Sequence, residues 1–189
     1  RLVVKIGILA LQGDYELHSQ LLGKNNIDSV LVKKMEQLNT IDGLIIPGGE
    51  SSVMLMLIDK YDFRKALTNF AKNKNIFGTC AGAIIMSLET NNCDNTLGLI
   101  DIKSDRNYWG SQIHSFTEEI ELKFTNDPYV GHFIRAPKFT CLSEDLITLS
   151  NLDKLPILIR NKQHLVSSFH PEMTDDFSVH NYFLGMINE

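Results

Sequence analysis

Apolar runs and amphipathic stretches alternate along the first half of the chain. Short runs rich in Val, Ile and Leu, a composition typical of buried strands, occupy residues 3–11, 29–32, 44–46 and 76–77. Between them, apolar residues recur at helical spacing after polar residues that can cap a helix, namely Asp14, Ser51 or Ser52, and Asp62. Strands that alternate with helices predict an α/β fold, with a mostly parallel central sheet and flanking helices.

The second half of the chain has a different pattern. Short strand-like runs follow one another over residues 99–102, 119–124, 133–136, 146–149, 157–160 and 165–169. A last amphipathic helix is predicted from about Thr174 and carries Phe177, Tyr182, Phe183 and Ile187. We find no internal repeat and no linker, so we expect residues 1–189 to form one domain with short strands added in its second half.

Composition narrows the classes of function. The net charge is −5 without a basic cluster, which argues against nucleic acid as the main partner. No apolar run approaches the roughly 20 residues of a membrane span, and the N-terminal residues read as a strand rather than a signal peptide. The three cysteines, Cys80, Cys93 and Cys141, lack the spacing of a disulfide framework, so we expect a cytoplasmic protein. Neither they nor the six histidines show metal-ligand spacing, and we expect no metal and no cofactor.

A cysteine stands at a predicted turn from strand to helix. The segment 78–82 reads Gly-Thr-Cys-Ala-Gly and joins the strand at 76–77 to the apolar run at 83–86. This is the layout of a nucleophile elbow, with Cys80 in the place of serine. The glycines permit a strained turn, and a helix N-terminus favours a thiolate over a thiol. Because buried cysteines are common and usually inert, this motif alone leaves the structural and the catalytic interpretation open.

A possible base and its orienting group follow near the end of the chain. A cysteine nucleophile needs both, and His170-Pro171-Glu172 offers an imidazole and a carboxylate two residues apart. On an extended backbone both side chains point to the same side. Alone, the motif reads as a strand end followed by a turn that begins at proline. Together with the cysteine elbow it favours a catalytic triad of Cys80, His170 and Glu172.

Two consecutive glycines follow the strand at 44–46. Backbone N–H groups are exposed at such a loop, and acyl transfer needs donors aimed at the developing oxyanion. The N–H groups of Gly49 and of Ala81, which follows the nucleophile, are the candidates for an oxyanion hole. Gly-Gly is also common in turns, so this prediction depends on the other two motifs.

These motifs resemble the class I, triad-type glutamine amidotransferases. The resemblance is closest to the branch that supplies the glutaminase subunits of pyridoxal 5′-phosphate synthase, and it rests on residues 9–14, 47–52, 106–112 and 133–137. It spans the whole chain. It implies a three-layer, flavodoxin-like fold and hydrolysis of glutamine to glutamate and ammonia through a γ-glutamyl thioester. The implied partner is a (β/α)8-barrel synthase subunit, which builds pyridoxal 5′-phosphate from a pentose phosphate, a triose phosphate and ammonia.

The resemblance also implies roles for individual residues. Cys80, His170 and Glu172 match the triad, and the glutamine-binding positions are Gly48, Gly49, Glu50, Arg106, Ile134 and Arg135. Gln12 and Gly13 match a loop near the oxyanion hole that responds to docking of the partner. A guanidinium suits the α-carboxylate of glutamine, which favours Arg106 as its partner. The alternative for Arg106 is a solvated surface charge, and for Arg135 it is simply the end of a strand.

Two groups of residues stand outside these roles. We expect His18, His114, His132, His164 and His180 to have structural or surface roles, with His18 also a candidate contact of the partner. Val53-Met54-Leu55-Met56-Leu57 replaces a segment in which relatives often have one or two arginines, and its apolar stripe predicts core packing. Two other functions remain open: the glutaminase of another amidotransferase, such as that of histidine biosynthesis, and a non-catalytic regulatory subunit with the same fold.

Overall fold

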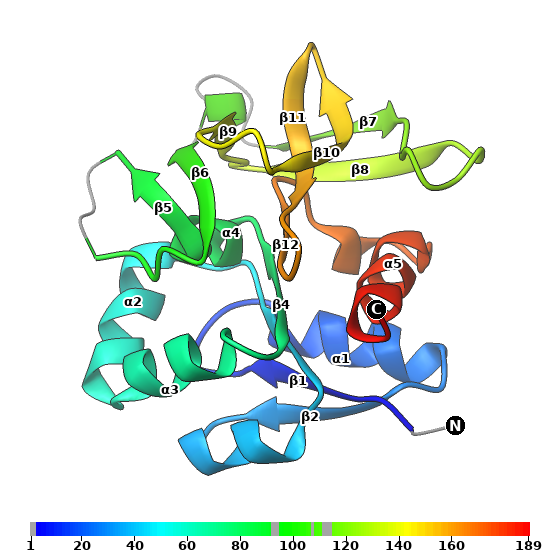
Figure 1. Cartoon of the computed structure of the whole chain (residues 1–189). Helices are drawn as coiled ribbons and strands as arrows, with labels where there is room; N and C mark the ends of the chain where they lie inside the picture. Colours follow the sequence, from blue (N-terminus) through cyan, green and yellow to red (C-terminus); the bar gives the residue numbers. More distant parts are fainter. Residues whose placement is uncertain (1–2, 92–94, 107, 111–114) are drawn as a thin grey trace.

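The computed structural model describes residues 3–91, 95–106, 108–110 and 115–189. Its centre is a seven-stranded sheet in the order β10-β11-β12-β4-β3-β1-β2 (Figure 1). The strands are β1 (Lys5–Leu9), β2 (Asp28–Val32), β3 (Gly43–Ile46), β4 (Asn75–Thr79), β10 (Ile147–Leu152), β11 (Leu155–Arg160) and β12 (Leu165–Ser167). Neighbours from β2 to β12 run parallel, whereas β11 and β10 add to one edge in antiparallel fashion. The expected mostly parallel sheet is therefore confirmed.

Helices cover both faces of this sheet (Figure 1). They are α1 (Tyr15–Lys24), α2 (Ser51–Lys60), α3 (Phe63–Phe70), α4 (Ala81–Met86) and α5 (Ser178–Ile187), with short 3₁₀ helices η1 (Met35–Thr40), η2 (Tyr108–Gly110) and η3 (Pro171–Met173). Side chains alternate between the faces along each strand, so Leu44 and Ile46 pack toward α2, α3 and α4, whereas Ile45 packs toward α1 and α5. The result is the expected arrangement of three layers.

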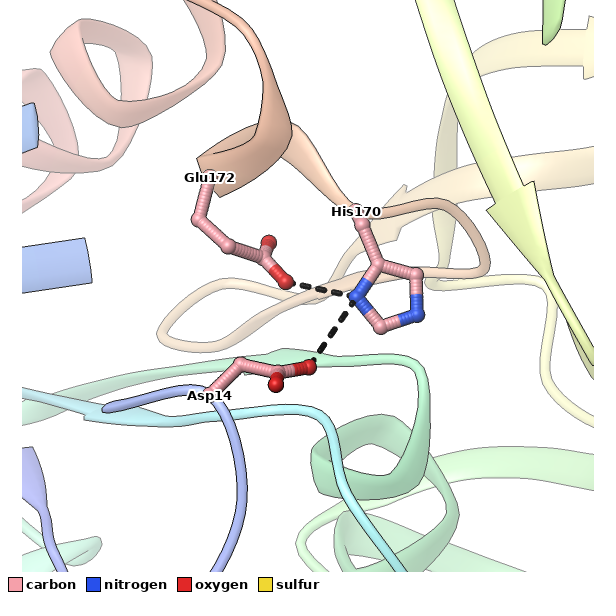
Figure 2. Close-up of side chains that lie close together, drawn as sticks. All are labelled: Asp14, His170 and Glu172. Carbon is pink, nitrogen blue, oxygen red and sulfur yellow. Dashed lines mark hydrogen bonds and ion pairs between the residues drawn. The ribbon is translucent and has the colours of Figure 1, made fainter. Parts of the chain in front are cut away.

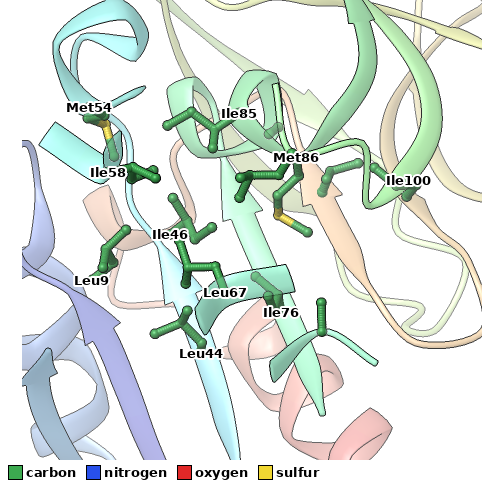
Figure 3. Packing of buried hydrophobic residues seen from close by; sticks show 14 of the residues in the cluster. Leu9, Leu44, Ile46, Met54, Ile58, Leu67, Ile76, Ile85, Met86 and Ile100 are labelled. Carbon is green, nitrogen blue, oxygen red and sulfur yellow. The ribbon is translucent and has the colours of Figure 1, made fainter. Parts of the chain in front are cut away.

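The first of these two cores joins strands to helices from distant parts of the chain. Met54 and Ile58 of α2 and Leu67 of α3 pack against Ile46 of β3 and Ile85 of α4 (Figure 3). All five are buried. This packing holds the start of α4, and with it Cys80, against the ends of the central strands.

The expected apolar stripe of α2 is only partly buried. Met54 and Leu55 belong to the core, in agreement with the prediction. Val53 and Met56 are exposed, which corrects it. A helix that lies on a sheet buries one face, and Met56 stands on the opposite one.

The second half of the chain also forms two small sheets, and there the bounds of several strands differ from the predicted ones. A three-stranded sheet contains β5 (Ser87–Thr90), β6 (Ile100–Asp105) and β9 (Lys138–Cys141), and a hairpin contains β7 (Ser115–Ile120) and β8 (Tyr129–Ile134). The strands predicted at 119–124 and 133–136 therefore begin four residues earlier than expected, and β5 and β9 are additional. Their sequences are polar and lie at sheet edges, so they lack the apolar run by which buried strands are recognised.

Helix starts also differ from the prediction. Glu50, not Ser51 or Ser52, caps α2, because its carboxylate accepts hydrogen bonds from the N–H groups of Ser52 and Val53. The last helix begins at Ser178 rather than near Thr174. Asp14 and Asp62 precede α1 and α3 as expected, but neither side chain makes a capping hydrogen bond.

In the ranges described above, no helix combines the length and the apolar character that crossing a membrane requires.

Candidate active site

Four loops meet at the carboxyl end of the sheet. They follow β1, β3, β4 and β12, which are neighbours in the central sheet. Open α/β sheets place their sites at this edge because the loops after parallel strands converge there. The loops line a cleft of about 390 Å³ that contains Asp14, Gly49, Cys80, Arg106 and His170. A cleft of this size can hold a small molecule.

Cys80 stands in a strained turn between β4 and α4. Its φ of 49° and ψ of −106° are unusual for a residue with a side chain, and such strain is concentrated at functional sites. The close backbones explain the flanking glycines. A Cβ on Gly78 would lie 2.7 Å from the Gly82 carbonyl, and one on Gly82 would lie 2.8 Å from the carbonyl carbon of Ile46. The predicted elbow is present in the structure, with Cys80 buried at the start of α4.

His170 and Glu172 form a buried pair. Nδ1 of His170 lies 2.5 Å from Oε1 of Glu172 (Figure 2). The expected extended backbone is wrong here: β12 ends at Ser167, and Glu172 lies in the short helix η3, which begins at Pro171. The turn of η3, rather than an extended strand, brings the carboxylate back to the imidazole.

The imidazole of His170 connects this carboxylate to the cysteine. Burial by itself would lower the pKa of His170, but hydrogen bonds and charge from Cys80 and Glu172 raise it to about 11. The charged imidazolium is thus favoured beside the thiol. The Cys80 thiol also donates toward the carbonyl oxygen of Ile134, at 3.7 Å. The structure therefore brings together the three residues predicted as the triad.

Asp14, expected only as a helix cap, also belongs to this site. Its Oδ2 lies 3.8 Å from Nδ1 of His170, the same ring nitrogen that contacts Glu172 (Figure 2). Asp14, His170 and Glu172 are close enough to be considered as metal ligands. However, 2.5 Å between Nδ1 and Oε1 is shorter than the roughly 3 Å that separates two ligands of one tetrahedral zinc ion. A direct hydrogen bond is the better description of this pair. The one sequence signal that could have indicated Asp14 as a site residue is its position directly after Gln12-Gly13.

The loops after β1 and β3 interlock beside the cysteine. The N–H of Asp14 donates to the Gly48 carbonyl, and the N–H of Glu50 donates to Oε1 of Gln12, both at 2.9 Å. A Cβ on Gly49 would lie 2.5 Å from this same Oε1 atom, and one on Gly13 would overlap the Gly48 carbonyl. Gln12 and Gly13 are therefore packed directly onto the glycine loop. Gly49 and Ala81 line the cleft beside Cys80, whereas their role in an oxyanion hole stays a prediction.

Two charged residues at the cleft are paired with each other. Arg106 donates to Oε1 of Glu50 at 2.9 Å and to Oγ of Ser52 at 3.0 Å. Burial tends to raise the pKa of Glu50, but the N–H groups at the start of α2 and the Arg106 guanidinium hold it below its usual range. Ser52 was not among the predicted site residues. These contacts hold the Arg106 guanidinium in place, so it is not a freely solvated surface charge.

Ile134 and Arg135 reach the cleft as a turn at the end of β8. Arg135 has a φ of 45° and an exposed side chain, and both residues line the cleft. The alternative interpretation of Arg135, that it simply follows the end of a strand, is correct for the backbone, since β8 ends at Ile134. The predicted segment 106–112 is described only in part, because Asn107, Ser111 and Gln112 lie outside the described residues, as do Cys93 and His114.

Two of the remaining histidines are closer to the triad than expected. His18 and His180 are buried behind Glu172, with Nε2 of His18 at 3.5 Å from Oε2 of Glu172. His18 is far from Glu172 along the chain, which hides its proximity in the sequence. His132 contributes its carbonyl oxygen, which accepts the N–H of His170 at 2.8 Å.

Comparisons with known proteins agree with this geometry. The model of the SNO glutamine amidotransferase family matches residues 8–189. The chain is 42% identical over 186 residues to the pyridoxal 5′-phosphate synthase subunit PdxT of Fervidobacterium nodosum, covering 97% of each protein. It is 43% identical over 189 residues to the PdxT subunit of Bacillus thuringiensis, covering 99% of this chain and 96% of that protein.

Solved structures show the same similarity. A crystal structure of a glutamine amidotransferase superposes with a TM-score of 0.92 at 37% identity, covering 97% of this chain and 99% of that one. A second solved structure, of a protein from Thermoplasma acidophilum, has 16% identity and a TM-score of 0.70, covers 100% of this chain and 96% of its own, and shares the fold. The match along nearly the full length, together with a cysteine elbow facing a His–Glu pair, shows that this chain belongs to the SNO glutamine amidotransferase family.

Proposed function

We propose that this chain is the glutaminase subunit of a pyridoxal 5′-phosphate synthase. It hydrolyses L-glutamine to L-glutamate and ammonia and passes the ammonia to a synthase subunit. The observation that carries the proposal is the position of Cys80 in one cleft with His170, which is paired with Glu172, in a chain that matches the PdxT subunits over nearly its full length. On this proposal residues 1–189 act as one glutaminase domain in the cytoplasm.

The reaction begins at the sulfur atom of Cys80. The thiolate attacks the carboxamide carbon of glutamine, and the N–H groups of Gly49 and Ala81 stabilise the oxyanion. His170 donates its proton to the amide nitrogen, ammonia leaves, and a γ-glutamyl thioester remains. Water, activated by the now neutral His170, hydrolyses the thioester and releases glutamate. Glu172 holds the Nδ1–H of His170 through both steps, and no metal or organic cofactor takes part.

Glutamine would be recognised by one positively charged and one negatively charged side chain. Arg106 can bind the α-carboxylate, and Glu50 can bind the α-ammonium group, because the substrate is a zwitterion. Their existing ion pair keeps both groups in place before the substrate arrives. Gly48 and the turn at Ile134-Arg135 supply backbone groups around the side-chain carboxamide.

The partner in this proposal is a (β/α)8-barrel synthase subunit. Gln12 and Gly13 pack on the glycine loop that carries Gly49, so a partner that contacts the first loop can adjust the second. We therefore expect the glutaminase activity of the chain alone to be low and to rise when the barrel subunit docks. Such coupling prevents the wasteful hydrolysis of glutamine.

The test is glutamate release from L-glutamine, measured with and without the barrel subunit. Cys80→Ala serves as the blank. Release that the barrel stimulates and that disappears in the blank supports both the triad and the partner. Equal turnover with and without the barrel would refute the coupling. Release that is unchanged by Cys80→Ala would refute the triad.

A further inference from the structure

A buried polar cluster lies behind the triad, away from the cleft. His18 of α1 and His180 of α5 are almost completely inaccessible, at 0% and 1% exposure, although each carries two ring nitrogens. Nδ1 of His18 lies 2.8 Å from Nε2 of His180. On its other side, Nε2 of His18 lies 3.3 Å from Oγ1 of Thr79 and 3.5 Å from Oε2 of Glu172. The cluster thus ends on the triad carboxylate.

The second oxygen of Glu172 needs a partner. The Glu172 side chain is fully buried, and Oε1 is engaged by His170. Within the described part of the chain, Oε2 has no hydrogen-bond partner at normal length. A buried carboxylate oxygen without any donor is costly, and such an atom calls for an explanation. Nε2 of His18 is the ring nitrogen that faces it.

Both histidines of the cluster are neutral. Burial, followed by the neighbouring His180 and His170 rings, lowers the pKa of His18 well below its usual value. Burial lowers the pKa of His180 to about 3. Each ring therefore carries a single N–H, and the direction of their shared hydrogen bond decides what His18 presents to Glu172.

Only one direction suits the carboxylate. If His18 donated from Nδ1, its bare Nε2 lone pair would face an anionic oxygen, and the N–H at Nδ1 of His180 would be buried without an acceptor among the described residues. If His180 donates from Nε2, His18 carries its proton on Nε2, which lies 3.3 Å from Oγ1 of Thr79 and 3.5 Å from Oε2 of Glu172, so this N–H is the donor available to the carboxylate. Nδ1 of His180 then carries a lone pair that receives no hydrogen bond from any residue the structure describes. A buried acceptor without a partner is tolerated better than a buried N–H without one.

We propose that His18 is a positioning residue for Glu172, and that His180 fixes the tautomer in which His18 points its N–H at the carboxylate. Glu172 is then held from both sides, by His170 at Oε1 and by His18 at Oε2. This inference rests on the proposed triad and extends it into the core. The ring of His180 is itself fixed between Phe77 and Phe177, at centroid distances of 5.8 Å and 5.9 Å.

The distance of 3.5 Å between His18 and Glu172 describes the chain without substrate. Catalytic hydrogen bonds are often long in that state and tighten in the complex with substrate. While His170 carries its positive charge, the carboxylate is drawn to it, and the donor on the far side keeps the carboxylate plane from rotating. The expected consequence of losing His18 is a lower kcat rather than a weaker binding of glutamine.

The test compares variants of buried histidines in the complex with the barrel subunit. For His18→Leu we expect kcat to fall about 10- to 100-fold with KM unchanged, the same range as when the outer hydrogen-bond partner of a metal ligand is removed. His18→Gln keeps an N–H near the position of Nε2 and should recover most of this loss. His164→Leu is the matched control: this histidine is also buried, but it accepts the N–H of Ile76, away from the cleft.

The pH profile and an NMR signal separate positioning from simple stability. In His18→Leu the charged form of the buried carboxylate loses a donor, so the acid limb of kcat should move to higher pH, whereas His164→Leu leaves it in place. The proton on Nδ1 of His170, observed by NMR in the isolated chain, should shift in His18→Leu and in His180→Phe. His180→Gln, which can still donate, should leave it closer to wild type.

Each outcome decides the proposal. Unchanged kcat, acid limb and Nδ1 proton signal in a folded His18→Leu protein overturn it. Equal losses in His18→Leu and His164→Leu also overturn it, since stability alone would then explain both. If His18→Leu does not fold, His180→Phe gives the same readings, with His180→Gln as its matched control. If the wild-type complex releases no glutamate, the proposed function fails, while the NMR comparison still tests the contact between His18 and Glu172.

Discussion

The tight approach of α4 to β3 gives a sharp prediction for Gly82→Ala. Gly82 lies in the first turn of α4, two residues after Cys80. A Cβ at this position would lie 2.8 Å from the carbonyl carbon of Ile46 and closer still to its oxygen. Carbon atoms prefer a separation of about 3.5–4.0 Å, so α4 must move away by roughly 0.7–1.2 Å. The obstacle is backbone in the centre of the sheet, which cannot rotate aside.

This movement has two measurable consequences. Overpacking of a core typically costs about 1–3 kcal/mol of unfolding free energy, and a misplacement of about 1 Å at a reacting group can cost on the order of 100-fold in rate. We therefore expect Gly82→Ala to unfold at lower urea concentration and to lose on the order of 100-fold in kcat. Urea unfolding followed by circular dichroism and glutamate release with the barrel subunit measure the two effects.

Another glycine supplies the matched control. Gly23 lies in α1, and a Cβ there meets nothing within 4 Å. Gly23→Ala should leave kcat unchanged and stabilise the protein by up to about 1 kcal/mol, because alanine favours a helix more than glycine does. If Gly82→Ala instead behaves like Gly23→Ala, the close packing of α4 on β3 is refuted as the reason for a glycine at this position.

Three further predictions concern recognition, acid stability and the interlocked loops. Arg106→Gln should raise KM for glutamine about 10- to 100-fold with a smaller effect on kcat, from the loss of a charge-assisted hydrogen bond worth about 1.5–3 kcal/mol. Arg64→Gln, which breaks the ion pair with Asp59 away from the cleft, is its control. If Arg106→Gln and Arg64→Gln have equal KM values for glutamine, the proposed role of Arg106 is excluded. Burial lowers the pKa of His164 from 6.5 to about 4, so the unfolded chain binds a proton that the folded chain does not between these two pH values. Stability should accordingly fall as the pH drops through this range, by on the order of 1 kcal/mol per pH unit, and urea titrations of His164→Gln should show a shallower dependence. Gly13→Ala, at a φ of 97° and against the Gly48 carbonyl, should abolish stimulation by the barrel subunit in the glutamate assay, and full stimulation would contradict the coupling of the two loops.

The parallel core could be predicted from the sequence because its strands are buried on both faces. The continuous apolar runs of β1, β3 and β4 have no other good explanation in a chain of this composition. The edge strands β5 and β9 are polar, and their pairing depends on neighbours that a local pattern does not contain. The sequence at 119–124 misled for a related reason: Leu122 and Phe124 pack into the core from a loop, so their apolar character signals burial rather than a strand.

The three residues proposed as the triad could be singled out from sequence because their motifs are local. The Cys80 elbow and the His170–Glu172 pair each occupy a few residues, and chemistry relates them. Asp14 and His18 carry no such local signal, because each acquires its place from the packing of α1 beside η3. Even for the His–Glu pair the expected backbone was wrong. The short helix after Pro171 could not be told from an extended strand by residue types alone.

The pairing of β12 with β4 has a consequence for how the protein is made. Leu165 of β12 lies beside Phe77 of β4, although a long stretch of chain separates the two in sequence. Contacts of such long sequence separation form late in folding, because a large loop must close first. His170 and Glu172 follow β12 directly, so a chain still emerging from the ribosome holds its cysteine elbow without the base proposed for it. On the proposed mechanism, a product truncated before residue 170 should be inactive rather than a leaky source of ammonia.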